Sequence, residues 1–110
     1  MEFSAKKEEK AIVVSVAGRM DAVSAPDFEK EMGTWLDKGE LFFVVECCNL
    51  DYISSSGLRS ILAVAKKLKA QNGRIVLSSL QDVVKEVFEI SGFSSIIPIY
   101  DSLDVAVSKL

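Results

Sequence analysis

The sequence predicts a single α/β domain over residues 1–110, with a mixed, mostly parallel sheet of four to five strands and about four helices. Short apolar runs rich in β-branched residues recur along the chain, and stretches with helical periodicity separate them. Strands that alternate with helices in this order are typical of a largely parallel sheet. The length of 110 residues, of which 49% are hydrophobic, suits one compact domain with its own core.

Two strands are expected before the first helix and one after it. Residues 10–17 contain a β-branched run, and Gly18 is expected to end this strand. Residues 3–8 are expected to pair with it as a short antiparallel edge strand. After the helix, residues 41–47 form a continuous apolar run, which is typical of a central strand covered on both faces.

The first helix is expected to begin at Ser24 and to end at Gly39. Ser24 can cap the helix, Pro26 is tolerated in the first turn, and Asp27 suits the positive end of the helix dipole. Apolar residues at helical spacing form the stripe that should face the core: Phe28, Met32, Trp35 and Leu36.

A second amphipathic helix is expected between a serine cluster and Gly73, and residues 74–78 should form the next buried strand. The apolar residues of this helix recur at helical spacing: Leu58, Ile61, Leu62, Ala65 and Leu68. Arg59 and Lys66 fall on its outer face, either as solvated charges or as partner contacts. Between them, Ala63 and Val64 are expected to make this face less polar, as in a binding surface.

Three elements are expected in the remainder of the chain. Residues 79–91 should form a helix that turns four apolar side chains inward: Val83, Val84, Val87 and Phe88. Residues 96–100 should form a short strand at an edge of the sheet, because Pro98 cannot donate a ladder hydrogen bond. Residues 102–110 should form a final short helix capped by Ser102.

The bulk composition bears on location and partners. The net charge of −3 argues against nucleic acid, whose binding needs a basic patch. No run reaches the roughly 18–20 apolar residues of a membrane span, so no direct membrane insertion is expected. Cys47 and Cys48 are adjacent, which makes a disulfide between them sterically awkward. Both are expected to be buried reduced thiols, which fits a cytoplasmic location.

The chain contains no histidine, which limits the chemistry available to it. A Ser-His-Asp triad and a Cys-His pair are impossible, and two adjacent cysteines do not make a zinc site. No phosphate-binding Gly-x-x-x-x-Gly-Lys or Gly-x-Gly-x-x-Gly pattern occurs. We therefore expect no catalytic residue, no metal and no cofactor, and we do not expect an enzyme.

Three consecutive serines, Ser54, Ser55 and Ser56, stand before Gly57 where a strand should give way to the second helix. A helix N-terminus presents unpaired N–H groups and partial positive charge. A serine there can cap the helix, or it can accept a phosphate that the helix end then stabilises. Ser56 is the expected cap, because it lies nearer the first helical turn.

Three stretches together resemble the STAS domain family, and within it the stand-alone anti-sigma-factor antagonists of bacteria. Residues 16–21 are similar to the family's Gly-x-Leu-Asp segment. Residues 49–58 are similar to its Asp-Ser-Ser/Thr-Gly-Leu signature, and residues 87–93 to its Leu-Phe-x-x-x-Gly-Leu segment. The resemblance covers essentially the whole chain, in the family's order and spacing.

The resemblance implies a regulatory binding protein that works by partner switching. Such an antagonist binds an anti-sigma factor that is also a serine kinase, and this binding frees the sigma factor. Phosphorylation of the antagonist by the kinase ends the complex, and a serine phosphatase restores the binding form. Aligned on the glycine, the acceptor is Ser55, with Ser56 as second choice. The implied partner-binding residues are Asp21, Ser54, Ser55, Ser56, Gly57 and Arg59.

The family's signature acid falls on Ser54 here, and this difference keeps a second function open. The alternative is a non-phosphorylated STAS scaffold, or an assembly subunit of a sensory or lipid-transport complex. Co-purification with a larger stable complex would favour that alternative.

Overall fold

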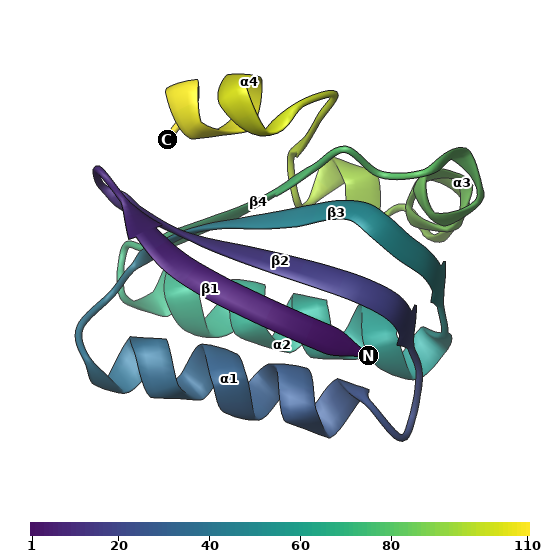
Figure 1. The fold of residues 1–110 in the computed structure, drawn as a ribbon, viewed down its shortest axis with the longest axis horizontal. Helices are drawn as coiled ribbons and strands as arrows, with labels where there is room; N and C mark the ends of the chain where they lie inside the picture. Colours follow the sequence, from purple (N-terminus) through teal and green to yellow (C-terminus); the bar gives the residue numbers. More distant parts are fainter.

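A computed structural model describes residues 1–110, which form one five-stranded sheet with helices on both of its faces (Figure 1). The strands are β1 (Glu2–Glu8), β2 (Ala11–Met20), β3 (Phe42–Ile53), β4 (Arg74–Ser78) and β5 (Ile99–Tyr100). The α-helices are α1 (Ala25–Asp37), α2 (Ser55–Ala70), α3 (Asp82–Ser91) and α4 (Leu103–Ser108), and a 3-10 helix, η1, spans Phe93–Ser95. The predicted fold class is confirmed.

The strand order in the sheet, β1-β2-β3-β4-β5, follows the order of the strands in the chain. β1 pairs antiparallel with β2, as predicted, and all other neighbouring pairs are parallel. β5 lies at the edge, but it has two residues instead of the predicted five. The N–H of Leu77 donates to the carbonyl of Pro98 at 2.9 Å. Pro98 itself has no N–H to donate to β4, so β5 does not extend to the residues before Ile99.

The two central strands run further than the sequence predicts. β2 continues past Gly18 to Met20, because the strand accommodates this glycine as an irregularity in its pairing with β3. Gly18 has φ +93, a conformation that glycine adopts without steric cost. β3 continues past Cys47 to Ile53 through a stretch in which most side chains are exposed.

Helices α1 and α2 cover one face of the sheet, while α4 lies over the other (Figure 1). The strands alternate accordingly, since successive side chains point to opposite faces. Ile12 and Val14 of β2 belong to the larger cluster under α1 and α2, which also contains Phe28 and Phe43. The smaller cluster packs around Ala106 of α4 and contains Ala11, Val13, Val44 and Val76.

Three burial predictions are wrong, each for a geometric reason. Val83 is 66% exposed, because the buried stripe of α3 runs through Val84 and Phe88 and leaves Val83 to one side. Cys48 is exposed while Cys47 is buried, since consecutive residues of a strand face opposite sides. Val64 is buried in the core, so it adds nothing to the outer face of α2.

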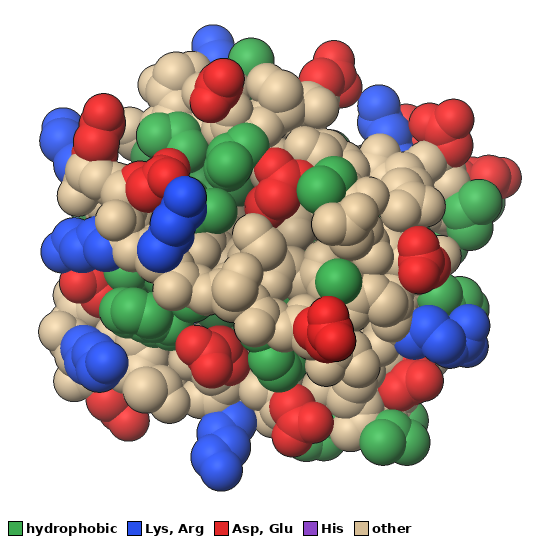
Figure 2. Space-filling model, in the orientation of Figure 1, with side chains coloured by type: hydrophobic (Ala, Val, Ile, Leu, Met, Phe, Trp, Pro, Cys, Tyr) green, Lys and Arg blue, Asp and Glu red, His purple; other side chains and the backbone are tan.

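None of the helices combines the length and the apolar character needed to cross a bilayer. On the face that Figure 2 shows, acidic and basic side chains are interspersed, and the basic ones form no continuous patch.

Candidate functional site

The serine cluster lies where the carboxyl end of β3 meets the start of α2, beside the carboxyl end of β2 (Figure 1). The register pairs Met20, the last residue of β2, with Ile53, the last residue of β3. The N–H of Ser54 then donates to the carbonyl oxygen of Met20 at 2.9 Å. This hydrogen bond fixes the start of α2 relative to the segment that follows β2, which contains Asp21.

Ser54 is the cap of α2. Its backbone is extended, with φ −91 and ψ 174, and its hydroxyl accepts a hydrogen bond from the N–H of Gly57 at 3.2 Å. The prediction that Ser56 caps the helix is wrong, because Ser56 already lies within the first turn, past the position from which a side chain caps. The position on which the resemblance places a signature acid is thus occupied by another good capping residue.

Gly57 is required by the close contact between α2 and the end of β2. A Cβ atom built on Gly57 would lie 2.7 Å from the Met20 carbonyl oxygen and 2.8 Å from Cγ1 of Ile53. Real Cβ atoms do not approach other atoms this closely. The glycine therefore lets the first turn of α2 lie directly on the two strand ends.

Ser55 and Ser56 have hydroxyls that make no hydrogen bond within the protein, in contrast to Ser54. Ser55, the first residue of α2, is exposed, and Ser56 is half-buried. Ser56 and Arg59 line a shallow hollow between α1 and α2, together with Ala22, Ala25, Pro26, Glu29, Ser60 and Ala63. The site predicted from the serine cluster thus offers two free hydroxyls at a helix N-terminus.

Asp21 is held in a tight turn by hydrogen bonds to Val23 and Ser24. Its Oδ1 accepts from the N–H of Val23 at 3.1 Å and from the N–H of Ser24 at 3.2 Å. The backbone N–H of Ser24 is the main reason why the pKa of the Asp21 carboxyl lies below its usual value. The Ser24 hydroxyl accepts a hydrogen bond from the N–H of Asp21 at 2.9 Å. It makes no capping hydrogen bond to α1, so the prediction that Ser24 caps this helix is wrong. Asp21 is therefore a fixed negative charge at the surface.

Arg19 and Tyr52 also belong to this surface, although no sequence motif singles them out. The register places Arg19 opposite Tyr52, and the guanidinium lies 4.0 Å from the centroid of the tyrosine ring. Arg19 Nε is also 4.0 Å from Oδ2 of Asp21. Only the cross-strand register brings these residues together, and the sequence does not reveal that register.

Helices α1 and α2 are joined next to the site by a hydrogen bond from Ser60 Oγ to Glu29 Oε2 at 3.1 Å. Ser60 is 5% exposed, so its hydroxyl serves the contact between the helices. Arg59, one position earlier, is exposed. The structure thus brings the predicted residues Asp21, Ser54 and Gly57 together through the end of β2, with Arg59 one turn further along α2. No group of three or more acidic or cysteine side chains gathers to hold a metal ion.

Comparison with known proteins agrees with this architecture. The family model described as "STAS domain" matches residues 2–106. BtrV of Bordetella bronchiseptica, a protein provisionally named an anti-sigma factor antagonist, is 40% identical over 108 residues, which cover 98% of this chain and 93% of BtrV. The anti-sigma-B factor antagonist of Bacillus subtilis is 30% identical over 95 residues, which cover 86% and 85% of the two chains.

A solved structure of Bacillus SpoIIAA, described as a cell fate determinant in its phosphorylated form, superimposes with a TM-score of 0.77. The match covers 98% of each chain at 19% identity, a level at which it concerns the fold alone. The family model spans nearly the whole chain, and the relative from Bordetella matches it at 40% identity. This protein therefore belongs to the STAS domain family.

Proposed function

We propose that this protein is an anti-sigma factor antagonist: it binds an anti-sigma factor and thereby frees a sigma factor. Both relatives described above carry this function in their names. The observation that carries the proposal is the position of Ser55, exposed at the start of a helix that packs through Gly57 directly against the ends of β2 and β3. The partner surface comprises Asp21, Ser54, Ser55, Ser56, Gly57 and Arg59.

The charge distribution supports an acidic region on the partner. Residues 52–80 contain no aspartate or glutamate, although the whole chain has 16 acidic residues. The same segment contains five cations: Arg59, Lys66, Lys67, Lys69 and Arg74. Helix α2 is therefore basic along its exposed side. Charge complementarity of this kind steers association and fixes the orientation of the partners.

We further propose that the anti-sigma factor is a serine kinase and that Ser55 is the residue it phosphorylates, with Ser56 as second choice. Ser55 is exposed and its hydroxyl has no partner within the protein, so a kinase can reach it without disturbing the fold. Ser54, by contrast, uses its hydroxyl to cap α2. A phosphate at the first position of α2 would face free N–H groups and the positive end of the helix dipole.

The phosphate would act through surface charge and would leave the fold unchanged. A phosphoserine adds about −1.5 to −2 charges near neutral pH. At Ser55 this charge would join Asp21 and oppose the basic side of α2, so an acidic partner would be repelled. A hundredfold loss of affinity, or about 2.7 kcal/mol, is enough to dissociate such a complex at ordinary concentrations. A serine phosphatase would then restore the binding form.

The test is mass spectrometry of the protein after incubation with ATP and candidate anti-sigma kinases from the same genome. We expect one phosphate on the wild type and none on Ser55→Ala. Ser94→Ala, which removes an exposed serine far from the site in sequence, is the matched control and should be phosphorylated like the wild type. A phosphate that persists in Ser55→Ala but disappears in Ser56→Ala would move the acceptor to Ser56.

Charge and shape can be separated with two nearly isosteric variants. Ser55→Asp and Ser55→Asn differ in one charge, so an electrostatic switch predicts that only Ser55→Asp binds the anti-sigma factor much more weakly. Equal binding by both would refute the electrostatic mechanism. Constitutive tight binding with no phosphorylation by any kinase would instead favour the scaffold function, to which the neutral Ser54 at the signature position points.

A further inference from the structure

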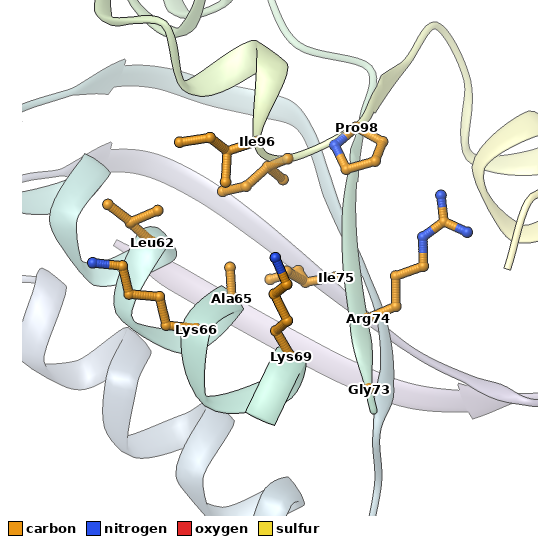
Figure 3. A pocket seen from close by; sticks show the side chains of 10 residues that line it. Leu62, Ala65, Lys66, Lys69, Gly73, Arg74, Ile75, Ile96 and Pro98 are labelled. Atoms are coloured by element: carbon orange, nitrogen blue, oxygen red, sulfur yellow. The ribbon is translucent and has the colours of Figure 1, made fainter. Parts of the chain in front are cut away.

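A second hollow lies away from the serine cluster, between the C-terminal half of α2 and the edge of the sheet (Figure 3). Its volume is about 500 Å³, which falls in the range of about 300–1,000 Å³ that is usual for small-molecule sites. Helix α2 contributes Leu62, Ala65, Lys66 and Lys69, β4 and its preceding turn contribute Gly73, Arg74 and Ile75, and the segment before β5 contributes Ile96, Ile97 and Pro98. None of these residues belongs to the partner surface around the serine cluster, although Lys66, Lys69 and Arg74 are among the cations of the basic segment described above.

The hollow exists because the sheet ends early at this edge. β5 pairs only with Leu77 and Ser78, so the first three residues of β4 have no strand beside them on that side. Pro98 prevents the ladder from continuing, since it has no N–H to donate. The apolar surface that a longer strand would cover is left open, and Ile96 at its rim is 58% exposed.

Two lysines of α2 line this hollow, and neither has an acidic partner. Lys66 and Lys69 lie one helical turn apart on α2, and Figure 3 shows the Lys69 side chain extending beside Ala65 and Ile75. Neither lysine takes part in any ion pair of the protein. The guanidinium of Arg74 is already engaged, because it donates to the carbonyl of Lys109 at 3.1 Å.

We propose that this hollow binds a monomeric acyl carboxylate. The hydrocarbon chain lies over Ile75, Ile96 and Ile97, and the carboxylate lies between Lys69 and Lys66. The chain gains from leaving water, and the carboxylate neutralises cations that have no partner within the protein. The lysine stems add apolar contact to the bound chain while their charged ends meet the carboxylate.

The probe is octanoate below its micelle concentration, titrated into the protein of residues 1–110 and followed by amide chemical shifts in NMR. The largest shifts are expected at Lys66, Lys69, Ile75 and Ile96. Lys69→Ala and Lys66→Ala should each weaken binding about two- to fivefold, as expected for an exposed ion pair. Lys67→Ala is the matched control, because Lys67 is an exposed neighbour on the same helix that does not line the hollow.

The apolar part of the site is tested with a pair of isoleucine variants, one inside the hollow and one outside it. Ile96→Ser removes an exposed side chain at the rim and should weaken octanoate binding about three- to tenfold, since part of an isoleucine is no longer covered. Ile90→Ser removes a side chain that is 79% exposed on α3 and lies outside the hollow, so binding should not change. Both variants alter exposed positions, so both are expected to fold.

Five results would overturn the proposal, and the first four concern the site and the charge. These four are an absence of shifts at the lining residues, an equal effect of Lys67→Ala and Lys69→Ala, octanol binding as tightly as octanoate, and binding only to phosphatidylglycerol vesicles. The last of these would assign the basic side of α2 to a lipid surface and leave the hollow without a ligand. Displacement of bound octanoate by acetate would also refute the role of the apolar chain.

Discussion

Gly57 packs directly against Met20, so that a Cβ atom at position 57 would lie 2.7 Å from the Met20 carbonyl oxygen. The same oxygen accepts the N–H of Ser54 at 2.9 Å. One backbone carbonyl at the end of β2 therefore determines both how closely the first turn of α2 approaches the sheet and how that turn is oriented. The exposure of Ser55 follows from this contact.

Gly57→Ala should destabilise the protein by about 1–3 kcal/mol, because the added methyl group has no room and α2 must shift away from β2. Urea denaturation measures the change. Gly33→Ala is the control: Gly33 lies within α1, and a Cβ atom added there would have no neighbour within 4 Å, so alanine should be neutral or stabilise by about 0.5–1 kcal/mol. Equal stability of Gly57→Ala and the wild type would disprove the contact.

Ser54→Ala should lower the free energy of unfolding by about 1 kcal/mol, because the N–H of Gly57 loses its acceptor. Ser54→Asp should retain most of the stability, since a carboxylate also caps and suits the positive helix end. Thermal unfolding distinguishes the three proteins.

Ser102→Ala is the matched control for Ser54. It removes the corresponding cap of α4, where the Ser102 hydroxyl accepts from the N–H of Val105 at 3.2 Å. It should cost some stability but leave phosphorylation of Ser55 unchanged. If Ser54→Ala and Ser102→Ala slowed phosphorylation equally, the Ser54 cap would have no specific role in presenting the acceptor.

Asp21 should make part of the stability dependent on pH. Its pKa in the folded protein lies below the ordinary value of 3.8, chiefly because the N–H of Ser24 stabilises the carboxylate. The resulting stabilisation is present above pH 3.8 and is lost as the pH falls from there through the folded pKa. The difference in unfolding free energy between wild type and Asp21→Asn should therefore shrink on acidification. A difference that grows in acid would contradict the assignment.

The two cysteines should react very differently with iodoacetamide. Desolvation raises the pKa of Cys48, with a further contribution from Glu46, so this exposed thiol should react more slowly than a cysteine in a short peptide. Burial raises the pKa of Cys47 far more, and this thiol should react only after unfolding. Mass spectrometry counts the labels, and Cys48→Ser should take up none in the native state.

The sequence predicted the elements whose pattern is determined locally. The stripe from Leu58 to Leu68 and the apolar run of β4 identify α2 and a buried strand, because burial of one face imposes helical or strand periodicity. The C-terminal ends of β2 and β3 were missed, because they are strands only through their hydrogen bonding to each other, which neither segment's own sequence shows. Gly18 resembles a strand end in sequence, but the β3 partner carries the ladder past it.

The predicted cap of α2 is two residues too late, two neighbouring side chains were missed, and both errors have physical causes. The cap is Ser54 instead of Ser56, because the cap is set by the residue at which β3 leaves the sheet and this depends on the bond to Met20. Arg19 and Tyr52 were missed because they lie far apart in the chain and meet only across the β2–β3 register.

The sequential order of the strands has a consequence for synthesis on the ribosome. Each strand after β1 pairs with the strand made just before it, so no strand has to insert between two that are already paired. The β1–β2 hairpin can form first, and β3 and β4 can then join one at a time as α1 and α2 emerge. At each stage the growing sheet has the outer edge of β1, which stays open in the finished fold, and one further edge at its newest strand. No additional unpaired edge has to wait for a later strand, which reduces the opportunities for aggregation before release.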